Sequence, residues 1–130
     1  MAFIKFKPIA SHFNFFVSLR KEDLSAEDLE YVDNDEKVLL AFRSKRDLGI
    51  FTDKRIILID KKGIRGFRKS IHAIKYESIS SYSLNINNLD SLVEIITDSS
   101  HRLLMKFLKP IPLEDVNIIY KYITNCLINE

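Results

Sequence analysis

The stretch of sequence that decides the fold runs from Asp47 to Tyr76 and reads DLGIFTDKRIILIDKKGIRGFRKSIHAIKY. It holds apolar and β-branched runs that are separated by two turn signals. The first signal is Asp53-Lys54, and the second is Asp60-Lys-Lys-Gly63, in which Asp opens a turn and Gly accepts a positive φ. Short apolar runs alternating with such turns are typical of antiparallel hairpins. We therefore expect a β-meander through this region.

The meander continues on both sides of this stretch. The runs that we interpret as strands cover residues 37–43, 47–52, 55–60, 64–70, 73–76, 80–86, 91–97 and 102–108. About seven strands result if one of the middle fragments is short or continuous with its neighbour.

The hydrophobic period changes after Pro110 and Pro112. Apolar residues then recur at spacings of three and four, as in an amphipathic helix that lies on a core. The residues of this stripe are Leu113, Val116, Tyr120, Ile123 and Leu127, and Ile119 and Cys126 widen it. The sequence therefore predicts the α+β class: a seven-stranded antiparallel bent sheet or barrel, capped by a C-terminal α-helix.

The chain divides into two predicted regions. Residues 1–35 are an aromatic N-terminal arm followed by a short acidic helix, and residues 36–130 form the main domain. The sequence Ser25-Ala-Glu-Asp28 fits a capping box, so we expect a short helix from Ala26 to about Val32.

Three segments carry a resemblance to a known family. They are residues 47–55 (DLGIFTDKR), 56–64 (IILIDKKGI) and 76–79 (YESI). These segments resemble the bacterial pleckstrin-homology (PH) domain family, densely over residues 47–66 and by order of elements from about Glu36 to Leu127. The resemblance implies a PH-like seven-stranded barrel capped by the last helix. It also implies members that self-associate into closed homo-oligomers.

The sequence departs from that family pattern in three places. Residues 65–69 read RGFRK where the family usually has a Lys-rich run of small residues, and Lys75 stands where a proline commonly precedes the tyrosine. Residues 86–90 (INNLD) replace an expected loop that contains glycine. These departures concern the ligand surface and leave the expected fold unchanged.

Charge is distributed unevenly along the chain, although the net charge is only +2. Between Arg43 and Lys75 there are eleven Lys or Arg against three Asp, a local charge of +8, whereas Glu22 to Glu36 contains eight acidic residues and no base. One interpretation is that these charges only keep loops and strand edges soluble. The other is that the two regions attract each other, within one chain or between copies.

Several predicted strands are apolar on both faces, for example residues 38–42 (VLLAF) and 56–59 (IILI). A sheet with one wet face alternates apolar and polar residues, so a second layer must cover these strands. Three covers are open: the aromatic arm, another copy of the chain, or the closing helix together with barrel bending. We favour self-association in which the arm participates. The predicted interface residues are Phe13, Phe15, Phe16, Ile57 and Ile59.

The basic cluster supports an alternative function, which is peripheral binding to anionic membrane lipids. In the PH relatives of eukaryotes, lipid phosphates are recognised at the end of the first strand, in the following loop and at the start of the second strand. Arg43, Lys45 and Arg46 occupy the matching positions. The full set of anion- or lipid-binding candidates is Arg43, Lys45, Arg46, Lys61, Lys62, Arg65, Arg68 and Lys69.

The remaining features bear on which functions to expect. Cys126 is the only cysteine, which favours a reducing compartment, and no apolar run approaches the roughly 20 residues of a membrane span. His12, His72 and His101 are isolated in sequence, so we predict no metal site, no catalytic residue and no cofactor. No nucleic acid or small-molecule substrate is expected either. The predicted protein is a non-enzymatic, PH-like interaction module of the cytoplasm that associates with itself, with an anionic membrane surface as the alternative partner.

Overall fold

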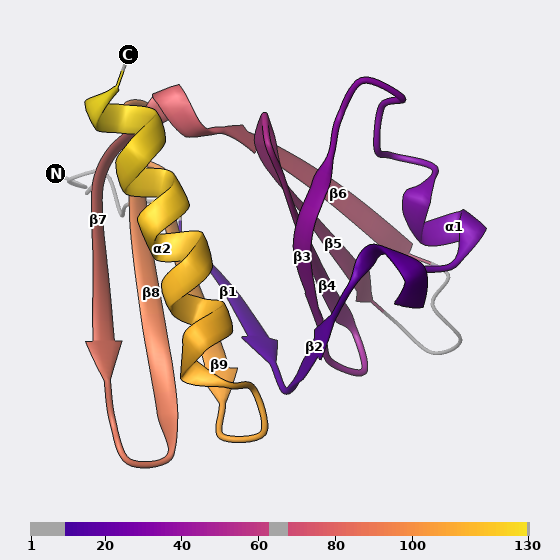
Figure 1. Ribbon diagram of the computed structural model, residues 1–130, viewed down its shortest axis with the longest axis horizontal. Coiled ribbons are helices and arrows are strands. Elements are labelled where there is room, and N and C mark those ends of the chain that lie inside the picture. Colours follow the sequence, from indigo (N-terminus) through magenta and orange to yellow (C-terminus); the bar gives the residue numbers. More distant parts are fainter. Residues whose placement is uncertain (1–9, 63–67, 130) are drawn as a thin grey trace, which may run out of the picture.

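The computed structural model describes residues 10–62 and 68–129, which form two β-sheets and a long C-terminal helix (Figure 1). The α+β class predicted from the sequence is confirmed. The four-stranded sheet has the order β1-β9-β8-β7, and the five-stranded sheet has the order β2-β3-β4-β5-β6. The strands are β1 (Ala10–Phe15), β2 (Val17–Leu19), β3 (Val38–Arg43), β4 (Asp47–Thr52), β5 (Arg55–Lys62), β6 (Arg68–Lys75), β7 (Ile79–Ile86), β8 (Asp90–Thr97) and β9 (Arg102–Leu108).

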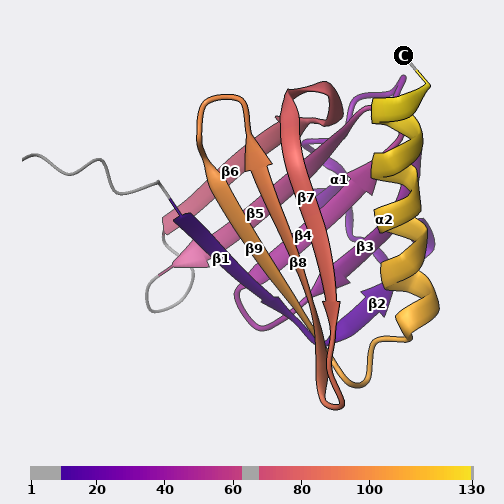
Figure 2. The same ribbon diagram turned by 90° about the vertical axis from the view of Figure 1, so that its left-hand side faces the viewer.

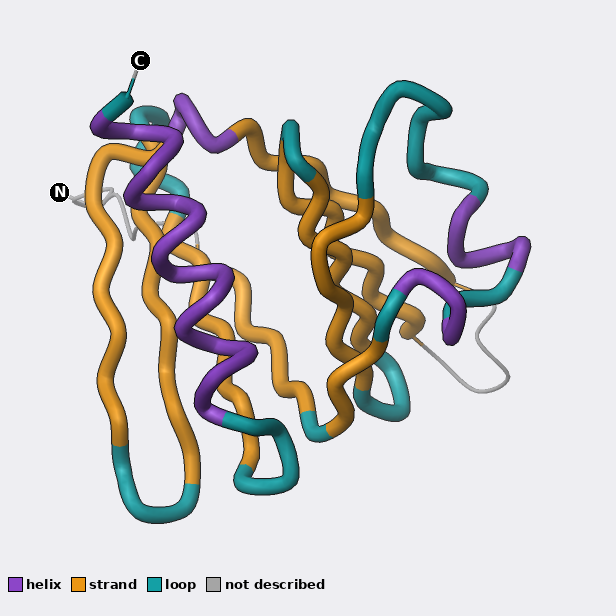
Figure 3. Tube along the Cα trace, viewed as in Figure 1, coloured by secondary structure: helices purple, strands orange, loops and turns teal. Residues whose placement is uncertain are grey.

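Four helical segments accompany the sheets in the described residues. They are the 3-10 turns η1 (Lys21–Asp23) and η3 (Tyr76–Ser78), the short helix α1 (Ala26–Leu29) and the closing helix α2 (Leu113–Ile128). The helix α2 lies against the four-stranded sheet, whereas α1 lies on the far side of the five-stranded sheet, as the tube in Figure 3 shows. The two sheets are therefore the inner layers of the molecule.

The described part of the chain contains nine strands rather than about seven. The two additional strands, β1 and β2, come from the N-terminal arm, where the sequence suggested no regular structure. β1 pairs with β9 in parallel and β2 pairs antiparallel with β3, so that one extended stretch, broken at Phe16, joins both sheets (Figure 2). The division of the chain at residue 36 into two regions stays a prediction.

Two predicted strand fragments, residues 64–70 and 73–76, differ from what is observed. In the structure β6 runs without interruption through residues 68–75 and pairs along its whole length with β5. Ile71 and His72, which the sequence suggested as a break, remain in register because each lies opposite a β5 residue. The predicted turn at Gly63 and the beginning of the fragment at Ile64 lie outside the described residues.

The main hydrophobic core lies between the two sheets and the inner face of α2. The arm contributes Phe13 and Phe15, and the Phe15 ring lies 5.5 Å from that of Phe107 and 6.0 Å from that of Phe42, measured between centroids. Phe15 is fully buried. The arm is thus part of the inner core, because alternation along β1 points Ser11, Phe13 and Phe15 toward the other sheet.

A second hydrophobic cluster covers the outer face of the five-stranded sheet. Here Leu24 and the partly buried Leu29 lie on Ile57 and Ile59, which are each 1% exposed. The complete cluster also contains Leu19, Tyr31, Val32, Val38, Ala41, Leu48 and Ile50. The prediction that these strands need a second layer is confirmed. The cover is neither another copy nor the aromatic residues of the arm, however, because residues 19–32 of the same chain provide it.

The closing helix presents a slightly different face to the core than predicted. Val116, Ile119 and Ile123 are buried, whereas Leu113 is 40% exposed because it is the first residue of α2 and lies beside the β7–β8 turn. The first turn of α2 also binds the arm. Asp115 accepts a hydrogen bond of 2.6 Å from the Ser18 hydroxyl, which fixes β2 against the helix.

The docking of the arm can be tested at Gly49 on β4. A Cβ atom at this position would lie 2.9 Å from Cζ of Phe15, which is buried and cannot move into solvent. We expect Gly49→Ala to destabilise the protein by about 1–3 kcal/mol in urea denaturation, through overpacking. In a Phe15→Leu background the same substitution should be much less destabilising. Equal losses in the two backgrounds would show that the Phe15 ring does not contact β4.

Candidate binding surfaces

The acidic segment and the basic strands attract each other within one chain. Asp28 on α1 forms an ion pair with Arg43 at the end of β3, and Glu27 accepts a hydrogen bond of 3.4 Å from Lys69 on β6. The Lys69 ammonium also lies 4.8 Å from the centroid of the Tyr31 ring. The uneven charge along the sequence therefore serves, at least in part, to fix the segment that covers the outer face of the five-stranded sheet.

The capping box predicted at Ser25 is present and explains why Asp28 is buried. The Asp28 backbone N–H donates to the Ser25 hydroxyl, and the Ser25 N–H donates to the Asp28 carboxylate. Burial disfavours the charged form of Asp28, but the hydrogen bonds with Ser25 and the charge of Arg43 outweigh it and lower the pKa of this carboxyl group. The negative charge of Asp28 is therefore stabilised by the backbone N–H of Ser25 and by the guanidinium of Arg43.

Glu36 is the centre of a second charged network at the other end of the sheet. Arg55 donates to its carboxylate from Nη2 at 2.7 Å and from Nε at 3.0 Å, and the Thr52 hydroxyl donates at 2.7 Å. Glu36 is only 8% exposed. The hydrogen bonds from Arg55, followed by those from Asp33 N–H and Thr52, lower the pKa of Glu36 to about 2 against the effect of burial.

The structure brings part of the predicted basic set to one end of the five-stranded sheet. Arg43, Lys45 and Arg46 lie at the β3–β4 turn, and the Lys61 N–H donates to the Arg46 carbonyl at 2.9 Å. Lys62 pairs with Arg68, and Lys61 with Lys69, at the end of the β5–β6 pairing. Arg65 lies outside the described residues. Arg43 and Lys69 form ion pairs with Asp28 and Glu27. The exposed cations at the β3–β4 turn are therefore Lys45 and Arg46.

The predicted oligomer-interface residues occupy different places from those expected. Phe13 and Phe15 are buried in the inner core, and Ile57 and Ile59 are buried beneath residues 19–32. All four are covered within a single chain, because the arm enters the core and the acidic segment covers the sheet. Of the five, only Phe16 is exposed, at 38%, where the chain passes from β1 to β2.

An apolar surface that the sequence did not reveal lies at the tip of the β7–β8 hairpin. Ile86, Leu89 and Leu113 are 58%, 70% and 40% exposed, and together they border a hollow of about 210 Å³. We call these three residues the hairpin-tip patch. The available signal was a leucine inside the turn Asn87-Asn-Leu-Asp90, where polar residues usually stand.

The hydroxyl and thiol groups near α2 have structural partners. Tyr76 donates to the Thr52 carbonyl and Tyr122 to the Asp53 carbonyl, each at 2.6 Å. Burial raises the pKa of Tyr122 to about 12 and also raises the pKa of the Cys126 thiol, so neither is activated as a nucleophile. Among the described residues, no three His, Cys, Asp or Glu side chains gather into a candidate metal site.

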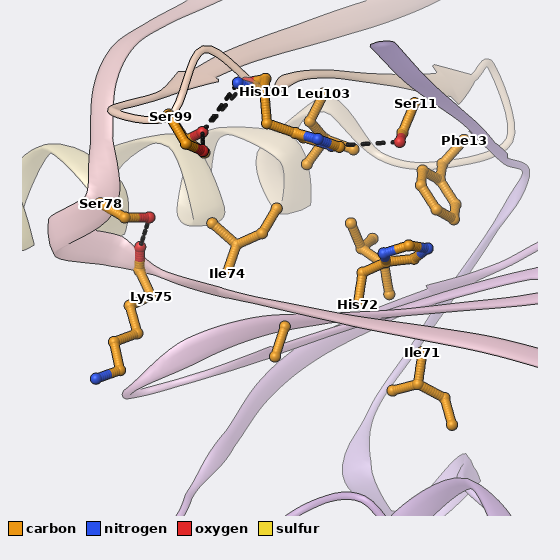
Figure 4. A pocket seen from close by; sticks show the side chains of 13 residues that line it. Ser11, Phe13, Ile71, His72, Ile74, Lys75, Ser78, Ser99, His101 and Leu103 are labelled. Atoms are coloured by element: carbon orange, nitrogen blue, oxygen red, sulfur yellow. Dashed lines mark hydrogen bonds between the residues drawn. The ribbon is translucent and has the colours of Figure 1, made fainter. Parts of the chain in front are cut away.

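The structure brings together two histidines that are far apart in sequence. His72 on β6 and His101 before β9 both line a cavity of about 600 Å³ that opens between β6 and the β1–β9 side of the four-stranded sheet (Figure 4). His101 Nε2 lies 3.2 Å from the Ser11 hydroxyl. His72 is exposed, and its side chain makes no hydrogen bond within the described part of the chain. His12 belongs to the opposite face of β1 and does not line the cavity.

Two packed sheets of mainly antiparallel strands, closed by a C-terminal helix, define a PH-like domain. A family model described as "Bacterial PH domain" matches residues 9–127, which is most of the chain. The chain belongs to the bacterial PH domain family. This confirms the resemblance seen in residues 47–79. The match begins at residue 9, within the arm, so it includes the two strands that the arm supplies.

Solved structures of bacterial proteins share this fold. A DUF1696 family protein with a pleckstrin-homology domain from Shewanella loihica PV-4 has a TM-score of 0.68 and 28% sequence identity, covering 83% of this chain and 93% of that one. A pleckstrin homology domain from Shewanella amazonensis SB2B has a TM-score of 0.55 and 27% identity, covering 68% of this chain and 74% of that one. A PH-domain-containing protein from Exiguobacterium sibiricum 255-15 has a TM-score of 0.66, covering 85% of this chain and 61% of that one. Its sequence identity to this chain is 16%, so the similarity concerns the fold alone.

A curated relative matches a shorter region of the chain. The uncharacterized protein YjqA of Bacillus subtilis (strain 168) is 48% identical over 63 residues, which is 46% of this chain. The matched region spans 50% of that relative's length. In the described residues, no helix has the length and hydropathy needed to cross a bilayer.

The Glu36 network predicts a specific pH dependence of stability. Because the folded-state pKa is depressed from 4.5 to about 2, the ionised carboxylate stabilises the fold above the unfolded-state pKa, and this contribution is lost as pH falls between those values. The loss should be on the order of 3 kcal/mol. Glu36→Gln should be less stable at neutral pH and should show a shallower decline over that acidic range, as measured by urea denaturation.

The matched control for this experiment is Glu30→Gln, because Glu30 is an exposed acid in the same segment. This variant should keep the pH dependence of the unmodified protein. A Glu36→Gln protein with that same dependence would contradict the assignment of the depressed pKa to Glu36.

Proposed function

We propose that this protein is a non-catalytic PH-like module that associates with further copies of itself through the hairpin-tip patch. The observation that carries the proposal is the exposure of Ile86, Leu89 and Leu113 around one hollow. These side chains come from the end of β7, the β7–β8 turn and the first residue of α2. Three large apolar residues from separate segments thus form one continuous surface rather than scattered exposed residues.

Burial of this patch would supply a sizeable association energy. Transfer of each large aliphatic side chain out of water contributes roughly 1.5–3 kcal/mol. None of the three residues belongs to either hydrophobic cluster, and their exposure shows that the described segments of the same chain leave them uncovered. The adjacent hollow, bordered by Phe107 and Ile111, offers a place for an apolar side chain of a second copy.

The patch replaces the surface on which self-association was first expected. Self-association through the five-stranded sheet requires an uncovered outer face, and residues 19–32 cover that face. Self-association therefore rests on a different set of residues, and an assembly formed through the patch leaves both hydrophobic clusters intact. The bases at the β3–β4 turn also remain accessible in such an assembly.

Self-association is tested by comparing Leu89→Lys with Ile128→Lys. Both residues are highly exposed, at 70% and 71%, but Ile128 lies at the end of α2, away from the patch. Light scattering over a concentration series should show the unmodified protein and Ile128→Lys as oligomers, and Leu89→Lys as a smaller species. Added salt should not dissociate the oligomer, because the contact is apolar. A monomeric unmodified protein at all concentrations would end this proposal.

A second candidate function is peripheral binding to anionic lipid at the β3–β4 turn. Exposed Phe16 borders the same shallow surface as Lys45 and Arg46, so an apolar side chain accompanies two exposed cations. Val17, which follows Phe16, is 41% exposed. Attraction to an anionic membrane contributes about 1 kcal/mol per base, and insertion of an aromatic ring adds to it. Two bases support weak attachment only.

Liposome flotation tests the lipid candidate. Vesicles that contain phosphatidylserine should carry more protein than neutral vesicles, and Lys45→Glu with Arg46→Glu should abolish the difference. Lys54→Glu with Lys121→Glu is the matched control, since it changes the net charge equally at two other exposed bases. Flotation that is the same for both double variants would dispose of a specific role for the β3–β4 turn.

A further inference from the structure

The cavity between β6 and the β1–β9 side of the four-stranded sheet, which we call the β6 cleft, arises where inward-facing positions change from apolar to polar. Along β1 the inward residues are Ser11, Phe13 and Phe15, and His101 continues the inward register of Leu103 on β9. The sandwich is closed by aromatic and aliphatic residues in its middle. At this corner, inward-facing positions carry the hydroxyl of Ser11 and the imidazole of His101 instead of apolar side chains. The corner is therefore open, and its mouth is polar.

β6 shows the same change on the opposite wall. Ile74 lies opposite Ile56 and belongs to the main core, whereas His72 lies opposite Leu58 on the same face and is exposed. In Figure 4 the His72 ring projects into the cleft, while Ile71 points away from it. On the core-facing side of the edge strand β6, the apolar Ile74 thus has as its neighbour His72, whose imidazole has no hydrogen-bond partner in the described residues.

The lining of the cleft is chemically divided. Its inner wall is made of Phe13, Leu58, Ile74 and Leu103, all of them buried. Its mouth carries His72, His101 and the hydroxyl of Ser11. None of the thirteen lining residues is an aspartate or a glutamate. The mouth therefore offers hydrogen-bond donors to an anion and no opposing carboxylate.

We propose that the β6 cleft binds an amphipathic carboxylate, which is a small molecule with an aliphatic chain and one carboxylate group. The chain lies against the inner wall, and the carboxylate accepts hydrogen bonds from His72 and His101 at the mouth. A volume of about 600 Å³ falls within the range of roughly 300–1,000 Å³ that is usual for small-molecule sites. This site is separate from the hairpin-tip patch and does not depend on self-association.

Two physical arguments favour this ligand over a fully polar anion. A phosphate group would leave the apolar inner wall unused, and any part of it that entered the cleft beyond the mouth would lose hydration without replacing its hydrogen bonds. An aliphatic carboxylate instead keeps its charge at the wet mouth, where it receives charge-assisted hydrogen bonds, and buries only carbon. No small-molecule substrate is expected from the sequence alone, because His72 and His101 are separated along the chain and only the sheet packing brings them to one cavity.

The proposal is tested by titrating the full-length protein with decanoate, below its micelle-forming concentration, and with decanol as the uncharged equivalent. Nuclear magnetic resonance of backbone amides reports both affinity and location. We expect saturable binding of decanoate, with shifts in β1, β6 and the segment before β9. We also expect His72→Ala to bind decanoate roughly tenfold more weakly, with weak decanol binding unchanged, since only the charged group uses the imidazole.

His12→Ala is the matched control, because His12 is exposed on the opposite face of β1, one residue from Ser11. It should bind decanoate like the unmodified protein. The proposal is overturned by the absence of saturable decanoate binding, by equal affinity in the His72→Ala and unmodified proteins, or by equal weakening in the two histidine variants. Shifts that map away from the cleft would overturn it as well. Leu89→Lys should retain decanoate binding, which separates this result from the self-association test.

Discussion

The structure depends on a five-stranded sheet that is apolar on both faces. Along β5, Ile56 and Leu58 face the four-stranded sheet, while Ile57 and Ile59 face the opposite way, and all four are almost completely buried. Such a sheet is stable in water only between two covering layers. The four-stranded sheet with α2 supplies one layer, and residues 19–32 supply the other. The long acidic insertion between β2 and β3 is therefore an integral part of the hydrophobic structure.

Electrostatics fixes this second layer in place. Apolar residues such as Leu24 and Leu29 alternate with acids that pair with bases on the strands beneath, notably Asp28 with Arg43. Charges that are segregated along the chain thus become neighbours in space. Arg43 and Lys69 consequently form ion pairs with acidic residues of the same chain, which leaves fewer cations for an anionic membrane. For this reason the apolar hairpin-tip patch, rather than the basic surface, carries the proposed function.

The candidate binding surfaces lie where the two layers end. The hairpin β7–β8 extends past the core and exposes Leu89, and the corner between β6 and β1 leaves His72 uncovered. The polar groups of the interior, by contrast, are satisfied: among the described residues, every buried side-chain nitrogen and oxygen atom has a hydrogen-bond partner. Function in this PH-like domain is therefore expected at the ends and corners of the sandwich, in agreement with a scaffold whose interior is complete.

The sequence by itself determined most of the strands from Val38 onward, the closing helix, the capping box at Ser25 and the family. These features depend on local periodicity and turn chemistry, which neighbouring residues encode. Only the tertiary structure decided that Phe15 enters the core, that residues 19–32 cover Ile57 and Ile59, and that His72 meets His101 at one cleft. Such pairings join residues that are far apart along the chain. These pairings depend on which apolar faces of the two sheets and the helix are buried against each other. A local sequence pattern does not specify that choice.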